Sequence, residues 1–110
     1  MMNELITAVE KLVAEEYVRA KEKFGAKHAS QQEAYAVIKE ELQETVEQIN
    51  SSVEAVEVNY WDNVRNDNES GNVEVANGIY KNMVLAACEA IQTAAMCYKA
   101  TLGFERGEKQ

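Results

Sequence analysis

Apolar residues recur at helical spacing along most of this chain, and few residues interrupt the pattern. Proline is absent, and only five glycines occur, at positions 25, 71, 78, 103 and 107. Glycine and proline are the residues that most strongly end helices and form turns. The pattern therefore predicts an all-α helical bundle of three main long helices, in a single domain that spans residues 1–110.

The first two helices are predicted from their apolar stripes and from signals at their ends. We expect the first helix from about Asn3 to Phe24, with Gly25 after its last turn. The second begins after Ser30, because Ser30 and Glu33 have the spacing of a capping box. Weak helix formers at residues 50–52 predict a bend or break within it. Its apolar stripe consists of Tyr35, Ile38, Leu42, Val46, Ile49, Val53, Val56 and Tyr60.

The third helix differs from the other two in being apolar nearly all round. A polar loop is expected from Asn66 to Asn72, and the helix follows from about Val73 to Leu102. A helix without a wide polar face is buried on most of its sides, and three helices have too little mass to cover it. The sequence therefore predicts that the chain associates with itself through this helix, as a dimer or a tetramer.

The acidic composition narrows the classes of partner. The formal net charge is −8 at pH 7, whereas nucleic acids and anionic membranes bind clusters of Lys and Arg. Binding to either is therefore not expected, and a nucleic-acid-binding helical protein is the least favoured class. No stretch of 18 or more apolar residues predicts a membrane span. A divalent cation, or a substrate delivered with one, suits an acidic protein better. The same acidity is also the ordinary condition of many soluble cytosolic proteins, so both interpretations stay open.

Cysteine and histidine usage favours a cytoplasmic protein without nucleophilic chemistry. Cys88 and Cys97 are nine residues apart, too far to form a disulfide if both lie on one helix. We expect both to be reduced and buried. The N-terminus has no signal-peptide pattern. The single histidine, His28, is expected on the surface of the loop between the first two helices.

Three glutamates within five residues of the second helix form the first candidate metal site. On a helix, Glu40 and Glu44 lie one turn apart on one side, and Glu41 is about 100° round from Glu40. Clustered carboxylate oxygens suit Mg²⁺. The same residues also fit a solvated face, because Glu40, Glu44 and Glu47 point away from the apolar stripe. Spacing alone leaves both interpretations open.

Glu89 is the most informative single residue. It is the only acid between Glu74 and Glu105, and it lies within the most apolar helix. A buried carboxylate is costly unless it is paired, hydrogen-bonded or bound to metal. Gln92 lies on nearly the same face, so a structural polar network is one interpretation. An ion pair with a lysine across an interface is a second, and a metal or substrate role is a third.

Candidate substrate-binding residues are an aromatic–cation pair and isolated lysines. Trp61 and Arg65 lie near the end of the second helix. Such a pair suits a nucleotide base and its phosphate, but a tryptophan at this place also closes the end of a bundle. Single lysines able to meet phosphate are Lys39, Lys81 and Lys99.

The run Ala34–Glu44 resembles the second helix of the all-α nucleoside triphosphate pyrophosphohydrolases, the MazG-like family. That family carries Glu-Glu-x-x-Glu on one helix and Glu-x-x-Asp on a later one. The first motif is matched by Glu40, Glu41 and Glu44. The segment Glu89–Gln92 lies where the second is expected, with glutamine in place of aspartate and a longer separation between the motifs. The likeness is to the short variants of phage and prophage genomes.

The resemblance implies Mg²⁺-dependent hydrolysis of a nucleoside triphosphate to a monophosphate and pyrophosphate. The expected metal ligands are Glu40, Glu44, Glu89 and Gln92. Glu41 is the expected catalytic residue, either as a further ligand or by orienting the attacking water. Substrate binding is assigned to Lys39, Lys81, Trp61 and Arg65. The alternative from a different class is a non-catalytic helical oligomerisation or assembly protein, of phage type, that keeps the fold without the chemistry.

Overall fold

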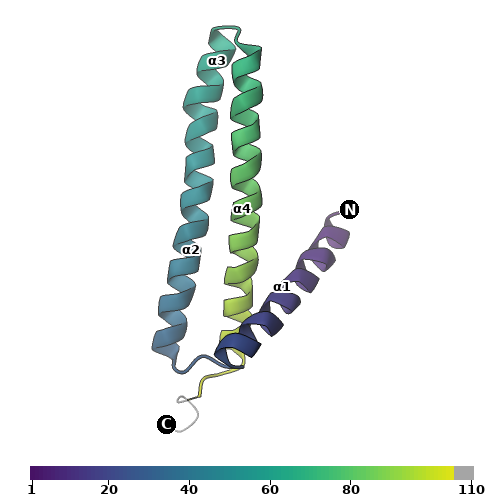
Figure 1. Ribbon diagram of the computed structural model, residues 1–110, viewed down its shortest axis with the longest axis vertical. Helices are drawn as coiled ribbons and strands as arrows, with labels where there is room; N and C mark the ends of the chain where they lie inside the picture. Colours follow the sequence, from purple (N-terminus) through teal and green to yellow (C-terminus); the bar gives the residue numbers. More distant parts are fainter. Residues whose placement is uncertain (106–110) are drawn as a thin grey trace. The chain divides into compact units, whose positions relative to one another are not determined.

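The computed structural model describes residues 1–105, and over these residues it is all-α with three long helices, as predicted (Figure 1). Helix α1 spans Met2–Phe24 and α2 spans Gln31–Glu54. A π-helix, η1, continues α2 over Ala55–Tyr60, and α3 follows over Trp61–Arg65 without interruption. Helix α4 spans Glu69–Thr101. None of the helices in the described chain has the length and apolar character needed to cross a membrane.

The start of α2 confirms the predicted capping residues. The Ser30 hydroxyl oxygen accepts a hydrogen bond from the Glu33 main-chain N–H at 3.2 Å. In return, Glu33 Oε1 accepts one from the Ala29 main-chain N–H, also at 3.2 Å. These bonds satisfy N–H groups that a helix start leaves without intrahelical partners. Helix α1 likewise begins and ends within one residue of its predicted bounds.

The predicted bend at residues 50–52 is wrong. Helix α2 stays α-helical through this segment to Glu54, and the departure from α geometry comes later, in η1. Ser52 is buried, with 5% of its surface exposed. Intrinsic propensity is a weak guide when packing holds a residue in place. At this point the packing around Ser52 therefore outweighs the weak helix propensity of residues 50–52.

The predicted loop Asn66–Asn72 is too long, because Asn68 starts α4 within it. Asn68 Oδ1 accepts hydrogen bonds from the Gly71 main-chain N–H at 3.0 Å and from the Ser70 hydroxyl at 3.3 Å. Asparagine is among the best N-cap residues. Asp67 has a φ of 53°, which turns the chain just before this cap. The helix thus begins at Glu69 rather than at about Val73.

Contacts within the chain divide it into two units, and each is described by itself. The first unit consists of Met1–Leu42 and the chain from Glu89 onward, and the second is Gln43–Cys88. In the second unit, residues 51–59 and residues 75–82 line one cavity of about 510 Å³. The end of α2 with η1 therefore lies beside the first half of α4 in this unit (Figure 1).

The first unit is held by contacts around the end of α1. The rings of Tyr17 and Tyr98 meet edge to face, with their centroids 5.1 Å apart. The Tyr17 hydroxyl donates a hydrogen bond to the Ala26 carbonyl oxygen at 2.9 Å. The chain beyond α4 returns to the same place, where the Glu105 main-chain N–H donates to the His28 carbonyl oxygen at 3.1 Å. These contacts join α1, the loop after it and the end of α4.

Large apolar side chains remain exposed in both units. The buried hydrophobic residues of the described chain are all alanines, namely Ala20, Ala34, Ala86 and Ala95. Along α2 and η1, the stripe residues Val46, Ile49, Val53 and Val56 are 44–49% exposed. In α4, Val84 is 47% and Leu85 is 51% exposed. A single copy of the chain therefore leaves apolar side chains of α4, the third long helix, uncovered. Burial of this helix by self-association stays a prediction.

Two further expectations are wrong. Cys88 and Cys97 are free thiols but are exposed rather than buried. In a single copy of the chain, large apolar side chains of the helix that carries them, such as Val84 and Leu85, are also exposed. His28 is buried, with 1% of its surface exposed, rather than lying on the surface. Its loop is closed by the returning chain near Phe104, with which His28 forms a β-bridge.

Candidate functional site

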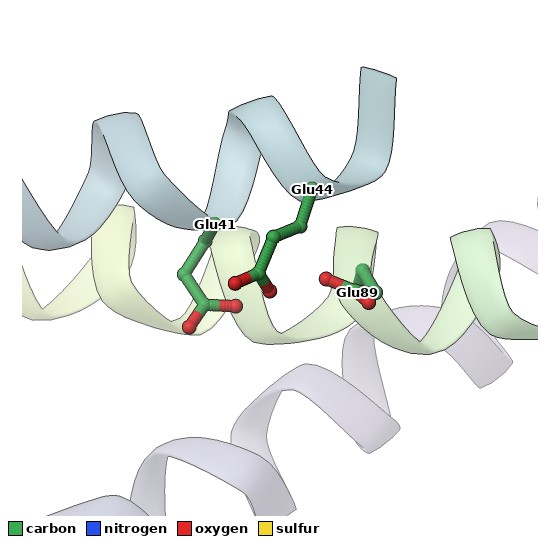
Figure 2. Close-up of side chains that lie close together, drawn as sticks. All are labelled: Glu41, Glu44 and Glu89. Atoms are coloured by element: carbon green, nitrogen blue, oxygen red, sulfur yellow. The ribbon is translucent and has the colours of Figure 1, made fainter. Parts of the chain in front are cut away.

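Three of the predicted site residues lie together. One carboxylate oxygen from each of Glu41, Glu44 and Glu89 lies within 4.8 Å of the others. Figure 2 shows Glu41 and Glu44 projecting from one helix toward the side of α4 that carries Glu89. Glu41 and Glu89 both belong to the first unit, where α2 carries Glu41 and α4 carries Glu89. Glu44 follows one turn further along α2, and residues three apart on a helix share a face.

The environment of Glu89 is unfavourable for an unpaired carboxylate. Glu41 and Glu89 are both half-buried. Within the part of the chain that the structure describes, Glu89 Oε2 is buried and has no hydrogen-bond partner. Burying a carboxylate oxygen without a partner is unfavourable. Several carboxylates at this distance also repel one another unless a proton or cation lies between them. Carboxylate oxygens are the ligands that Mg²⁺ and Ca²⁺ prefer.

A cleft of about 650 Å³ in the first unit adjoins this cluster through Glu41. Glu40 and Gln92, two of the four expected metal ligands, line this cleft and are not members of the three-carboxylate cluster. Small-molecule sites usually measure about 300–1,000 Å³, so the cleft has the size of a ligand pocket. Its wall comprises Glu16, Arg19, Ala20, Lys23, Phe24, His28, Glu33, Val37, Glu40, Glu41, Gln92, Met96 and Lys99.

The cleft carries charges of both signs. Four carboxylates and three basic side chains line it. Arg19 Nη2 lies 2.7 Å from both carboxylate oxygens of Glu16. The hydrogen bond to Glu16, followed by the charge of that carboxylate, raises the pKa of Arg19 above its ordinary value. Lys99 is the one of the three that is buried, with 3% of its surface exposed.

His28 closes one wall of the cleft. Its Nε2 lies 3.1 Å from the Met96 carbonyl oxygen, and since a carbonyl only accepts, Nε2 carries the proton. Its Nδ1 lies 3.7 Å from Glu33 Oε1. The structure therefore assigns His28 a positioning role between the loop, α2 and α4. This role was not predictable from the sequence, because a lone histidine in a short loop has no recognisable partner.

The predicted substrate-binding residues do not line this cleft. Lys39 extends over the ring of Tyr35, with its Nζ 5.6 Å from the ring centroid. Arg65 forms an ion pair with Asp62 at 2.8 Å, and Trp61 is 57% exposed. Lys81 lines the cavity of the second unit. Lys99, in contrast, lines the cleft, and it was singled out in the sequence only as one of three isolated lysines.

Comparisons with known proteins add no further relationship. No model of a protein family matches the chain, and no curated protein or solved structure matches it. The resemblance to the MazG-like pyrophosphohydrolases therefore stays a prediction from the two glutamate motifs.

Proposed function

We propose that this chain binds a divalent cation through Glu41, Glu44 and Glu89 and hydrolyses a nucleoside triphosphate to a monophosphate and pyrophosphate. The observation that supports this most directly is the approach of three carboxylate oxygens to within 4.8 Å of one another. Two separate segments of the chain supply these oxygens. A solvated acidic face would need carboxylates from one helix only, so the added carboxylate of Glu89 supports a shared ligand.

The residues around the cluster have separate proposed roles. A bound Mg²⁺ supplies charge neutralisation at phosphate oxygens and lowers the pKa of a coordinated water. Glu89 and Glu44 hold the cation, and Glu41 either adds a ligand or orients the water. Glu40 and Gln92 face the cleft beside Glu41. Gln92 offers a neutral oxygen, so its contribution to binding a dication is weaker than that of a carboxylate.

The direct test of this proposal is pyrophosphate release from nucleoside triphosphates. The parent chain is incubated with each of the common ribo- and deoxyribonucleoside triphosphates and Mg²⁺, and pyrophosphate is measured. Release that needs the cation and is lost in Glu89→Gln supports the proposal. Glu47→Gln is the matched control, because Glu47 is an exposed acid of α2 outside the carboxylate cluster. Equal release by Glu89→Gln and the parent would show that this site does not perform the reaction.

A second candidate function is helical assembly without catalysis. It is supported by the large apolar side chains that stay exposed along α2 and η1, among them Val46, Ile49 and Val56, because an exposed apolar patch often marks a protein–protein interaction site. In this case the acids are a solvated face, and Glu89→Gln is neutral or mildly stabilising because it removes a partly buried charge. Self-association is compatible with both functions, so the discriminating residue is Glu89.

A further inference from the structure

We propose that Lys99 binds a phosphoryl group of a metal-bound polyphosphate in the cleft of the first unit, an inference that rests on the proposed metal site. Lys99 lies near the end of α4, ten residues beyond Glu89. Its side chain lines the 650 Å³ cleft that also contains Glu41. The same cleft thus contains a carboxylate of the metal cluster and a lysine.

Burial is the first observation that sets Lys99 apart. Only 3% of its surface is exposed, and lysine is almost never buried to this degree unless it is paired. Among the residues that the structure describes, the Lys99 side chain makes no hydrogen bond and no ion pair within 4.0 Å. A lysine side chain buried to this degree, without a protein partner and at the border of a ligand-sized cleft, is expected to meet an anion there.

The other cations of the cleft are less suited to this task. Arg19 already binds both oxygens of Glu16. Lys23 is exposed and lies over the ring of Phe24, with Nζ 5.5 Å from the ring centroid. The charge of Lys99 is therefore the one left for a ligand inside the cleft.

The acids of the cleft decide which anion fits. The carboxylates of Glu16, Glu33, Glu40 and Glu41 line it together with three basic side chains, so a free phosphate meets more acidic than basic groups. A polyphosphate that carries a divalent cation presents both signs, the cation toward Glu41 and the phosphate toward Lys99. An ammonium group binds phosphate as a compact charge with three donors. The ligand class is therefore a metal-bound di- or triphosphate rather than a free monoanion.

The experiment titrates the full chain with inorganic pyrophosphate in the presence of Mn²⁺, by calorimetry, for the parent and for Lys99→Met. Methionine keeps much of the length of the side chain and removes the charge. Lys21→Met is the control, because Lys21 is an exposed lysine of α1 that does not line this cleft. We expect at least about a tenfold loss of pyrophosphate affinity in Lys99→Met, no change in Lys21→Met, and unchanged binding of Mn²⁺ alone in both.

The outcomes separate this inference from the proposed function. Unchanged pyrophosphate affinity in Lys99→Met, with Mn²⁺ still bound, overturns the role of Lys99 and leaves the metal site standing. A parent chain that binds neither Mn²⁺ nor pyrophosphate overturns both. Should Lys99→Met fail to fold by circular dichroism, the parent alone decides, through the rate of acetylation of Lys99 measured by mass spectrometry. Slower acetylation of Lys99, but not of Lys21, in the presence of pyrophosphate and Mn²⁺ supports the inference. An acetylation rate of Lys99 that is the same with and without them contradicts it.

Discussion

The Nε2 atom of His28 lies 3.1 Å from the main-chain carbonyl oxygen of Met96, across 68 positions of sequence. This hydrogen bond joins the loop after α1 to α4, and it lies in the wall of the cleft that holds Glu41 and Lys99. A buried histidine that makes such a contact contributes to the position of the helices around it. The stability of the first unit should therefore depend on this side chain.

His28→Ala should lower the free energy of unfolding by about 1–3 kcal/mol, because it removes a buried hydrogen bond and leaves a cavity. Urea unfolding followed by circular dichroism measures the change. Gln32→Ala, at an exposed position of α2, should change it by less than about 0.5 kcal/mol. Equal stability of His28→Ala and the parent would contradict the observed burial.

Two glycines of α4 should respond in opposite directions to alanine. A Cβ at Gly71 would lie 2.5 Å from Asn68 Nδ2 and 2.9 Å from Asn63 Nδ2, whereas at Gly78 it meets nothing within 4 Å. Gly71→Ala should displace the Asn68 cap and lower stability by about 1 kcal/mol. Gly78→Ala should raise stability by about 0.5–1 kcal/mol, because alanine is the better helix former. Thermal unfolding of both variants tests the pair, and stabilisation by Gly71→Ala would show that the cap is dispensable.

Self-association should depend on the exposed apolar stripe of α2. Burying an isoleucine side chain contributes about 1.5–3 kcal/mol of free energy, and Ile49→Lys removes this contribution from any interface that covers the position. The dissociation constant should then rise at least about tenfold, and Val53→Lys should act in the same way. Analytical ultracentrifugation measures the shift toward the 12.3 kDa monomer. Gln43→Lys adds the same charge at another exposed position of α2 and serves as the control. A parent chain that is already monomeric would contradict the prediction.

The fold was predictable to the extent that local signals determined it. The spacing of apolar residues predicted the three long helices, and the pair Ser30 and Glu33 predicted where α2 begins. The start of α4 was misplaced because the run 66–72 is polar throughout, and composition does not show that Asn68 caps a helix. The π-helix η1 had no signal, since its residues fit an α-helix equally well.

The candidate site was predictable in part. The isolation of Glu89 in an apolar helix marked it for attention. The motif spacing predicted Glu40 and Glu44 as the pair on one side of the second helix, whereas the structure groups Glu41 with Glu44. The approach of Glu89 to Glu41 depends on how two helices pack, which spacing within either helix does not determine. The buried state of Lys99 and His28 depends on α1 and on the chain after α4 in the same way.

The most direct test of the central claim is a calorimetric titration of the parent chain and of Glu89→Gln with Mn²⁺ and Mg²⁺, with and without a non-hydrolysable nucleoside triphosphate. We expect the parent to bind the cation, to bind it more tightly with the nucleotide, and to lose at least about tenfold in affinity on Glu89→Gln, since one carboxylate ligand is lost. Circular dichroism should show the same helix content in both. Cation binding by Glu89→Gln equal to that of the parent would contradict the site formed by Glu41, Glu44 and Glu89.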